Sequence, residues 1–137
     1  MNDNIQPEAM FKFSYGLYVL SASCDGKDNG CIINTAVQLT DAPKQVAIAV
    51  NKANLTHDMI FADGRFNLQS GRNADKFDGI KTERSLNGLV YLPEATNGFL
   101  SGKVTFKKDA GTHTLFIADV TEAKVLSAVP SVTYAYY

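Results

Sequence analysis

The sequence is poor in the residues that make covalent or metal-based cross-links. Among its 137 residues are only two cysteines, Cys24 and Cys31, and two histidines, His57 and His113. The spacing of the cysteines does not match a CxxC redox or zinc pattern. With so few potential ligands we expect no metal site. We interpret both thiols as structural or incidental, because free cysteines are commonly buried like small apolar residues.

Blocks of one charge and long apolar runs are also missing. The formal net charge is −1 at pH 7 and no Lys/Arg-rich block occurs, so we expect neither nucleic acid nor an anionic membrane as the main partner. No apolar run approaches the ~20 residues needed to cross a bilayer. The first residues, 1–6, lack the apolar stretch of a signal peptide. These absences lead us to expect a cytoplasmic protein.

The residues that are present suit one folded domain. Hydrophobic residues make up 45% of the chain and charged residues 20%, both ordinary values for a globular protein. A chain of this length buries a core without cross-links. Because no repeat, low-complexity tract or linker divides the sequence, we expect a single domain over residues 1–137.

Two short helices are predicted from start and stop signals. The first begins at Pro7, a residue suited to a first helical turn, and is followed by apolar residues on one side. The second is expected over Leu55–Ala62, between a cap at Asn54 or Thr56 and a stop at Gly64.

The other apolar stretches have the alternation or the composition of β-strands. The first two, Tyr15–Ala22 and Cys31–Leu39, flank the turn signals Asp25–Gly26 and Asn29–Gly30, which predicts a hairpin. Many strands with short turns and two small helices predict a mostly β fold, and the long strands favour an antiparallel barrel over a sandwich. The further strands are expected over Gln45–Val50, Arg65–Leu68, Leu89–Leu92, Phe99–Phe106 and Thr112–Leu126.

The stretch Asn51–His57 leaves a strand and opens a helix, and it is the first candidate for a binding site. Free N–H groups at the start of a helix attract anions. Lys52 adds a positive charge there, and Asn54 and Thr56 offer hydrogen bonds to phosphate oxygens. Ordinary helix capping beside a solvated lysine accounts for the same residues without any ligand.

Two further segments carry polar residues that suit an anionic ligand. Ser70 and Arg72 lie in the turn SGRN, and arginine grips phosphate through two parallel hydrogen bonds, although exposed loops have the same composition. Asn34, Thr35 and Gln38 interrupt an otherwise apolar strand. Buried polar groups need partners, so these side chains meet either the polar edge of a ligand or each other across strands.

His113 leads into the apolar strand LFIADV. An imidazole at such a position stacks on a planar ring or hydrogen-bonds to it, and it changes charge near neutral pH. A half-buried structural histidine has the same sequence signature. No single one of these signals is specific, and their occurrence together in one small β domain is what indicates a site.

Taken in order, five motifs and the opening MFKFSYGLYVLSA resemble the flavin-reductase-like FMN-binding proteins, including flavoredoxin and the flavin domains that pair with rubredoxin. The resemblance extends over nearly the whole chain. The motifs are INTAVQLT, VNKANLTHDMI, SGRNADKF, GTHTLFIADV and TYAYY.

This resemblance implies an antiparallel split β-barrel with short flanking helices, and a homodimer with FMN near the subunit interface. It implies that the flavin ring and ribityl chain meet the polar residues of the first motif, and that the second and third motifs hold ribityl and phosphate. The implied FMN-binding residues are Asn34, Thr35, Gln38, Asn51, Lys52, Asn54, Thr56, Ser70, Arg72, Lys76 and Phe77.

The sequence departs from the family pattern at two places. His113 falls where related reductases carry Gly–Asp–His, a motif linked to nicotinamide, and here Thr112 replaces the aspartate. Relatives also have a helical segment before the SGR motif and a longer tail, whereas here Leu68 continues directly into Gln69. Because loss of that helix would expose apolar core, we expect the intact protein to be heavier than the 14.9 kDa of this sequence.

The expected function is that of an oxidoreductase that moves electrons from NAD(P)H through FMN to rubredoxin, another redox protein or free flavin. The protein would bind and orient the flavin, with His113 as the residue that influences the rate. One alternative is a non-enzymatic FMN electron carrier of the flavoredoxin kind. A flavin-free β-barrel binding module is a more distant one, and the absence of a basic aromatic face disfavours it.

Overall fold

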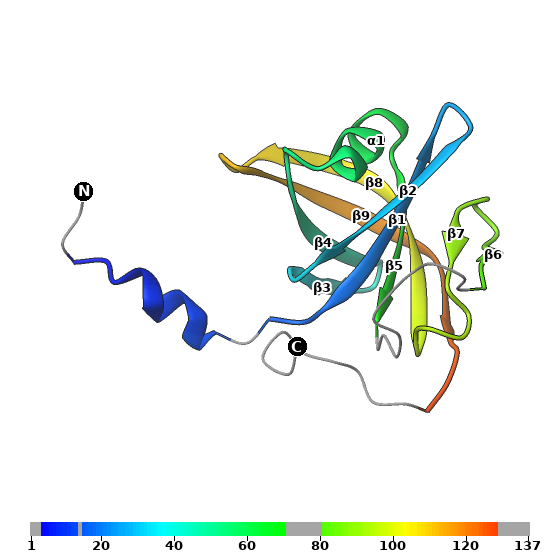
Figure 1. Ribbon diagram of the computed structural model, residues 1–137, viewed down its shortest axis with the longest axis horizontal. Coiled ribbons are helices and arrows are strands. Elements are labelled where there is room, and N and C mark those ends of the chain that lie inside the picture. The colour runs from blue at the N-terminus through cyan, green and yellow to red at the C-terminus, as the bar shows by residue number, and fades with distance from the viewer. Residues whose placement is uncertain (1–3, 14, 71–80, 129–137) are drawn as a thin grey trace.

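One antiparallel sheet of seven strands forms the body of the molecule (Figure 1). The computed structural model describes residues 4–13, 15–70 and 81–128. A 3₁₀ helix precedes the sheet and an α-helix follows its fourth strand. The elements are η1 (Pro7–Lys12), β1 (Tyr18–Cys24), β2 (Lys27–Ile33), β3 (Ala36–Asp41), β4 (Lys44–Asn51), α1 (Leu55–Asp63), β5 (Arg65–Ser70), β6 (Glu83–Arg84), β7 (Val90–Tyr91), β8 (Gly98–Asp109) and β9 (His113–Val125).

The strand order curls the sheet into a barrel that is open along one side. The order is β2-β1-β5-β8-β9-β4-β3, and β6 and β7 form a separate two-stranded ribbon. The two edge strands of the sheet, β2 and β3, are consecutive in the chain and are joined only by Asn34 and Thr35. Such a short connection keeps the two edges close, so the sheet bends round on itself and splits between β2 and β3 (Figure 1).

The inward faces of the strands and one side of α1 form the core. Phe66, Phe116 and Leu20 are fully buried, and α1 adds Met59 and Ile60. Packing is tight where β5 meets β8, because a side chain at Gly102 would lie 2.6 Å from the ring of Phe66. On β9 the alternation expected from the sequence is observed, since Thr114, Phe116 and Ala118 are all buried.

Most of the predicted elements are confirmed. The second helix occurs at Leu55–Asp63, with Asn54 as its N-cap and Gly64 in the left-handed region at φ 82° after its end. The first helix is present as a 3₁₀ helix at Pro7–Lys12. The strands expected near Gln45, Arg65, Leu89, Phe99 and Thr112 all exist, several of them a few residues longer than predicted.

The predicted strand Cys31–Leu39 is wrong, because the chain breaks at Asn34–Thr35 into β2 and β3, which pair with different neighbours. The hairpin turn also uses only one of the two turn signals. Asp25 and Gly26 both have positive φ, 54° and 77°, as a two-residue hairpin turn requires. Asn29 and Gly30 lie inside β2, opposite Ala22 and Ser21.

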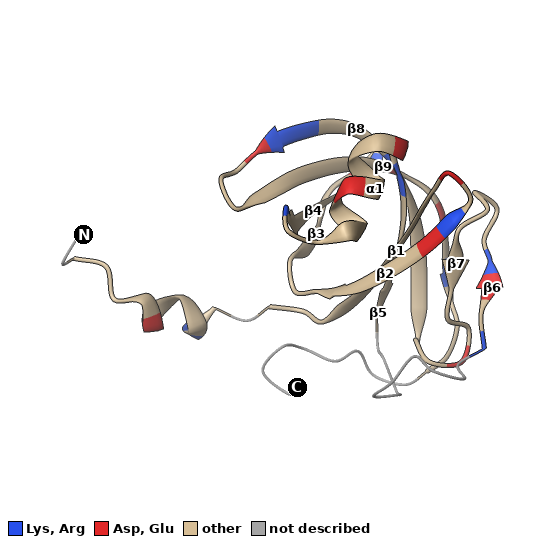
Figure 2. Cartoon of the chain, turned by 45° about the horizontal axis from the view of Figure 1, so that its top comes forward, with Lys and Arg blue, Asp and Glu red and all other residues tan. Residues whose placement is uncertain are grey.

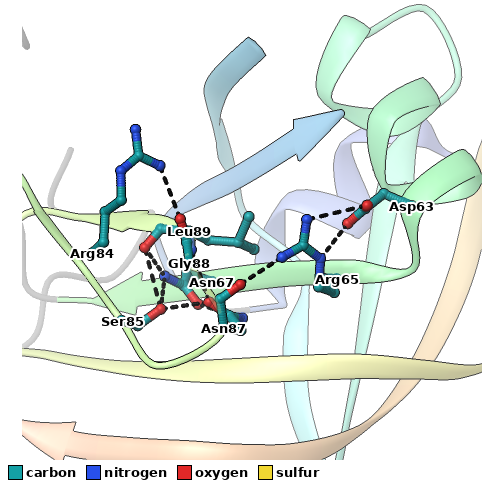
Figure 3. Close-up of polar contacts among 8 residues, drawn as sticks. All are labelled: Asp63, Arg65, Asn67, Arg84, Ser85, Asn87, Gly88 and Leu89. Carbon is teal, nitrogen blue, oxygen red and sulfur yellow. Dashed lines mark hydrogen bonds and ion pairs between the residues drawn. The ribbon is translucent and has the colours of Figure 1, made fainter. Parts of the chain in front are cut away.

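A buried polar cluster fastens the segment 85–89 to the outer side of β5 (Figure 3). We call Asn67, Ser85, Asn87, Leu89 and Ser101 the Asn67 cluster. The amide nitrogen of Asn67 donates to Ser85 Oγ at 2.9 Å and to the carbonyls of Leu89 and Val90, and its oxygen accepts from Ser101 Oγ at 2.7 Å and from Asn87 Nδ2 at 3.3 Å. Asn67 has no exposed surface, so its side chain is closed to ligands.

β5 runs without interruption through the point where relatives are expected to have an extra helix. Leu68 pairs with Leu100, and Gln69 pairs with Phe99. Gln69 is fully buried; its amide donates to Ser21 Oγ at 2.8 Å and its oxygen accepts from the Leu92 N–H at 2.9 Å. The direct connection is therefore part of the strand. The expected excess of the intact mass stays a prediction.

Charged residues are scattered over the described part of the barrel (Figure 2). At the tip of β8 the basic pair Lys107 and Lys108 is followed at once by Asp109. Within the described ranges no helix is long and apolar enough to cross a membrane. The same ranges contain no group of three or more His, Cys, Asp or Glu residues placed to hold a metal ion.

Candidate functional site

Four of the residues singled out in the sequence line one cavity at the open side of the barrel. We call it the asparagine groove. Its volume is about 190 Å³, and it lies where the end of β2, the end of β4, the start of α1 and the start of β9 come together. The lining residues are Leu17, Ile32, Ile33, Asn34, Ala49, Asn51, Asn54 and His113.

The backbone explains why these distant residues meet. Asn51 and His113 are paired in the ladder between β4 and β9. Ala49 N–H donates to the Thr35 carbonyl at 3.2 Å, which holds the Asn34–Thr35 connection beside β4. The chain then turns from β4 into α1, and the Asn54 N–H donates to the Asn51 carbonyl at 3.1 Å. Strand pairing and one tight turn therefore build the groove.

The side-chain oxygens of the three asparagines all accept hydrogen bonds within the protein, two of them from the backbone. Asn51 Oδ1 accepts from the Ala53 N–H and Asn54 Oδ1 from the Thr56 N–H, both at 2.9 Å. Asn34 Oδ1 accepts from the Thr35 hydroxyl at 3.0 Å. Within residues 4–13, 15–70 and 81–128, the Nδ2 groups of Asn34 and Asn51 have no hydrogen-bond partner. The groove thus presents amide donors beside an apolar wall.

The Asn54 amide lies beside the thiol of Cys31 on β2. Burial raises the pKa of the Cys31 thiol, and hydrogen bonds from Thr56 and Asn54 partly oppose that rise. The second thiol, Cys24, is also free. A raised pKa keeps Cys31 protonated and unreactive at neutral pH, which agrees with a structural role.

His113 stands at the first position of β9, at the rim of the asparagine groove. Its Nδ1 lies 2.8 Å from the Thr112 hydroxyl, and its Nε2 has no hydrogen-bond partner among the described residues. The ring is therefore held at one nitrogen and leaves the other for a ligand. Thr112, the residue that departs from the family pattern, provides this contact.

Lys52 follows Asn51 but does not line the groove. Its Nζ lies 2.7 Å from Asp109 Oδ1 at the end of β8. The Lys52 hydrogen bond, and a second from the Gly111 N–H, lower the pKa of the Asp109 carboxyl. The sequence showed the cation but gave no indication of this acidic partner, which lies 57 residues further along the chain.

Thr56 is placed differently from the sequence-based expectation. Its side chain is fully buried, and its hydroxyl donates to Asn29 Oδ1 on β2 at 2.7 Å. A hydroxyl in this position is not available to a phosphate at the surface. Helical periodicity explains the difference, because the position two residues after the cap turns toward the barrel.

Gln38 and Ser70 lie outside the asparagine groove. Gln38 is exposed on β3 at the rim of a second cavity, of about 370 Å³, whose walls include Val46, Leu68 and Leu100. Its amide donates to the Thr40 carbonyl at 3.2 Å. Ser70 ends β5 opposite Tyr18, which in turn pairs with Ile33 of the groove. Adjacent strands are ~4.8 Å apart, so the Ser70 backbone is about 10 Å from that of Ile33.

Ser70 Oγ donates to Asn97 Oδ1 at 2.9 Å. The other predicted contacts from the same motif, Arg72, Lys76 and Phe77, lie outside the described residues.

Sequence reasoning missed the apolar wall of the groove, formed by Leu17, Ile32 and Ala49. The sequence analysis singled out none of these three residues; in the structure Ile32 remains 40% exposed on the edge strand β2.

Known proteins that resemble the chain were found by sequence and by structure. A high molecular weight rubredoxin of Moorella thermoacetica is 38% identical over 147 residues, which cover 95% of this chain and 64% of that protein. The chain thus spans less than two thirds of that relative. A ferric-chelate reductase (NAD(P)H) of Archaeoglobus fulgidus is 33% identical over 147 residues, which cover 95% of this chain and 87% of that protein.

Among solved structures, the flavin reductase PheA2 matches with a TM-score of 0.82 at 23% identity, covering 97% of this chain and 93% of the other. The agreement confirms the predicted mostly β, antiparallel split barrel. A model of the flavin reductase like domain matches residues 10–69 and 65–137. The two matched segments meet in β5, where Leu68 continues into Gln69. The chain belongs to the flavin reductase-like domain family.

Proposed function

We propose that this chain binds FMN at the asparagine groove and acts as a flavin reductase-like oxidoreductase that moves electrons from NAD(P)H to an acceptor. The observation that carries the proposal is a set of side-chain nitrogens without a partner among the described residues. Asn34, Asn51 and His113 each have one, and all three residues line one cavity with an apolar wall. Most ligand sites have this composition, a largely apolar surface with a few fixed polar groups.

The residues of the groove fit a flavin nucleotide in chemical type. Amide N–H groups suit the carbonyl oxygens of a flavin ring and the hydroxyls of a ribityl chain. The start of α1, with Asn54 as its cap, favours a phosphate through the helix dipole. A cavity of about 190 Å³ is smaller than the ~300–1,000 Å³ of sites that enclose such ligands, so the groove would hold part of FMN and leave the rest at the surface.

The relatives support the same assignment. One is named as a ferric-chelate reductase that uses NAD(P)H, and another as a high molecular weight rubredoxin. The flavin would supply the redox chemistry by accepting electrons from reduced nicotinamide and releasing them to the acceptor. The chain would hold and orient it, with Asn34 and Asn51 at the groove wall and Arg72, Lys76 and Phe77 as proposed contacts from the SGRNADKF motif.

The visible spectrum and anaerobic reduction test this function. The purified protein, or protein reloaded with FMN, should show flavin absorbance, and NADH or NADPH should bleach it rapidly in the absence of oxygen. Titration with FMN and FAD identifies the preferred flavin. A colourless protein that takes up neither flavin would disprove the proposal.

A non-enzymatic flavin electron carrier is the second candidate. The specific observation in its favour is Thr112, which occupies the place of the aspartate that the resemblance links to nicotinamide and which contacts His113 directly. A carrier would bind FMN tightly, react slowly with both nicotinamides, and exchange electrons with a protein. Stopped-flow mixing with NADH, NADPH and reduced rubredoxin separates the two functions.

The proposed partners are a second copy of the chain and a small redox protein such as rubredoxin. The exposed apolar residues Met10, Phe11 and Phe13 in and beside η1 support association with another surface, because none of the residues of η1 is buried within the chain. Light scattering of the flavin-loaded protein should give twice the mass of the chain. A monomer at micromolar concentration would contradict the homodimer.

A further inference from the structure

Two hydrogen bonds, one buried and one partly buried, tie the first turn of α1 to two different strands. Thr56 has no exposed surface and donates to Asn29 Oδ1 of β2 at 2.7 Å. His57 is 7% exposed, and its Nε2 lies 2.7 Å from Thr114 Oγ1 of β9. Thr114 is 3% exposed. Consecutive helix residues thus contact two of the three strands that bound the asparagine groove, β2 and β9.

The His57 ring is held on its other sides as well. Its Nδ1 lies 2.9 Å from Asp58 Oδ1. Its face stacks on Phe61 with ring centroids 5.9 Å apart, and it packs against Phe116 at 5.7 Å. Both ring nitrogens have partners, and two aromatic rings pack against the imidazole. The imidazole therefore links α1 to β9, and neither of its ring nitrogens is free to bind a ligand.

The two anchors are each next to a residue of the groove. Thr56 follows Asn54 by two residues and gives its N–H to the Asn54 side chain at 2.9 Å. Thr114 follows His113 directly and pairs with Val50, just as His113 pairs with Asn51. A movement of the α1 turn relative to β2 or β9 therefore changes the spacing between the start of α1 and the polar side chains on the strands.

We propose that Thr56 and His57 are positioning residues, which act through Asn29 and Thr114 to hold the start of α1 at the distance from the strands that a flavin nucleotide requires. This inference rests on the proposed function, because it assigns the phosphate end of the ligand to α1 and the ring end to the strands. Buried polar partners hold geometry strongly, since a donor or acceptor left unpaired in the interior is costly.

The test compares the affinities for FMN and riboflavin, which differ only in the phosphate. Thr56→Val and Thr114→Val keep the shape of the side chain and remove the hydroxyl, whereas Thr56→Ser and Thr114→Ser keep the hydroxyl. In the valine variants we expect the FMN-to-riboflavin affinity ratio to fall by roughly fivefold or more, the effect of weakening one hydrogen bond to a charged group. The serine variants should retain most of the wild-type ratio.

Ser101→Ala is the matched control. It removes a buried hydroxyl that donates to Asn67 at 2.7 Å, far from the groove in the Asn67 cluster. It should lower the melting temperature by as much as the valine variants do and leave the affinity ratio unchanged. Equal losses of FMN and riboflavin affinity in the valine variants, or no loss in either, would show that the two anchors are only structural. A wild-type protein that binds neither flavin would instead overturn the proposed function itself.

Discussion

The Asn67 cluster and the asparagine groove use the same type of side chain in different ways. The Asn67 side chain uses both its nitrogen and its oxygen within the protein and is fully buried. Asn34 and Asn51 each use only the oxygen among the described residues, and both residues line a cavity. What distinguishes a structural polar cluster from a binding site here is the set of donors left without a protein partner.

The first consequence concerns stability, and it has the largest expected effect. Asn67→Ala leaves Ser101, Asn87 and two carbonyls without their shared partner. Each unpaired buried group costs about 1–3 kcal/mol, and single substitutions seldom exceed ~4 kcal/mol. We expect the free energy of unfolding to fall by about 2–4 kcal/mol, measured by urea denaturation with circular dichroism, because the chain has no tryptophan to report unfolding.

Asn34→Ala is the counterpart of that variant in the groove. It should change the free energy of unfolding by less than about 1 kcal/mol, the usual value of one partly exposed hydrogen bond, and weaken FMN binding. If Asn34→Ala destabilised the fold as much as Asn67→Ala, or if Asn67→Ala weakened FMN binding in the folded protein, the distinction between the two regions would fail.

The second prediction separates capping from ligand binding at Asn54. Asp caps a helix as well as Asn does, and a negative charge at a helix start is favourable. Asn54→Asp should therefore keep the stability of the fold. The same charge repels a phosphate, so FMN affinity should fall by roughly 10- to 30-fold, the size of a partly screened repulsion at close range.

Riboflavin provides the control for this variant, because it has no phosphate. Its affinity should be nearly equal in wild type and Asn54→Asp when titrated by fluorescence quenching. A parallel loss for both flavins would place the phosphate elsewhere, and the start of α1 would then have only its structural role.

The third prediction concerns His113. Removing the imidazole should slow flavin reduction by NAD(P)H by roughly tenfold, the rate effect of losing one hydrogen bond of ~1.4 kcal/mol in the transition state. FMN should stay bound, because the ring is only one of the polar groups in the groove. The measurement is stopped-flow reduction of His113→Ala at saturating FMN, and an unchanged rate would remove His113 from the reaction.

Local sequence patterns predicted most helices and strands of the fold, but they did not predict the break in the second strand. The apolar alternation of β9 and the capping residues Asn54 and Gly64 of α1 are local patterns, so the sequence predicted these elements. The stretch from Cys31 to Leu39 is as apolar as a single strand, and only its pairing with two different partners divides it at Asn34–Thr35. Pairing is a long-range property that composition does not contain.

The site was predictable in kind and less so in detail. The sequence motifs identified Asn34, Asn51, Asn54 and His113, which the structure brings to one cavity. The motifs could not show that the Thr56 side chain faces the interior, because its direction depends on the way α1 packs on β2. The Asn67 cluster was missed altogether, since its members come from β5, β8 and the segment 85–89 and no local spacing relates them.

The ion pair between Lys52 and Asp109 gives the smallest expected effect. The two side chains are 38% and 75% exposed, and surface pairs of this kind contribute little. With Nζ held 2.7 Å from a carboxylate, Lys52 adds little net positive potential beside the groove. Asp109→Asn removes the opposing charge, so FMN affinity should rise by roughly two- to fivefold.

Salt dependence distinguishes this cause from a change in shape. If Lys52 is released toward the phosphate, the gain in FMN affinity should disappear as the salt concentration rises, because exposed charges are screened. Riboflavin affinity should not change at any salt concentration. A gain that is equal for both flavins, or that persists at high salt, would mean that Asp109 affects the groove through the β8–β9 turn, where its carboxylate also accepts from the Gly111 N–H at 2.9 Å.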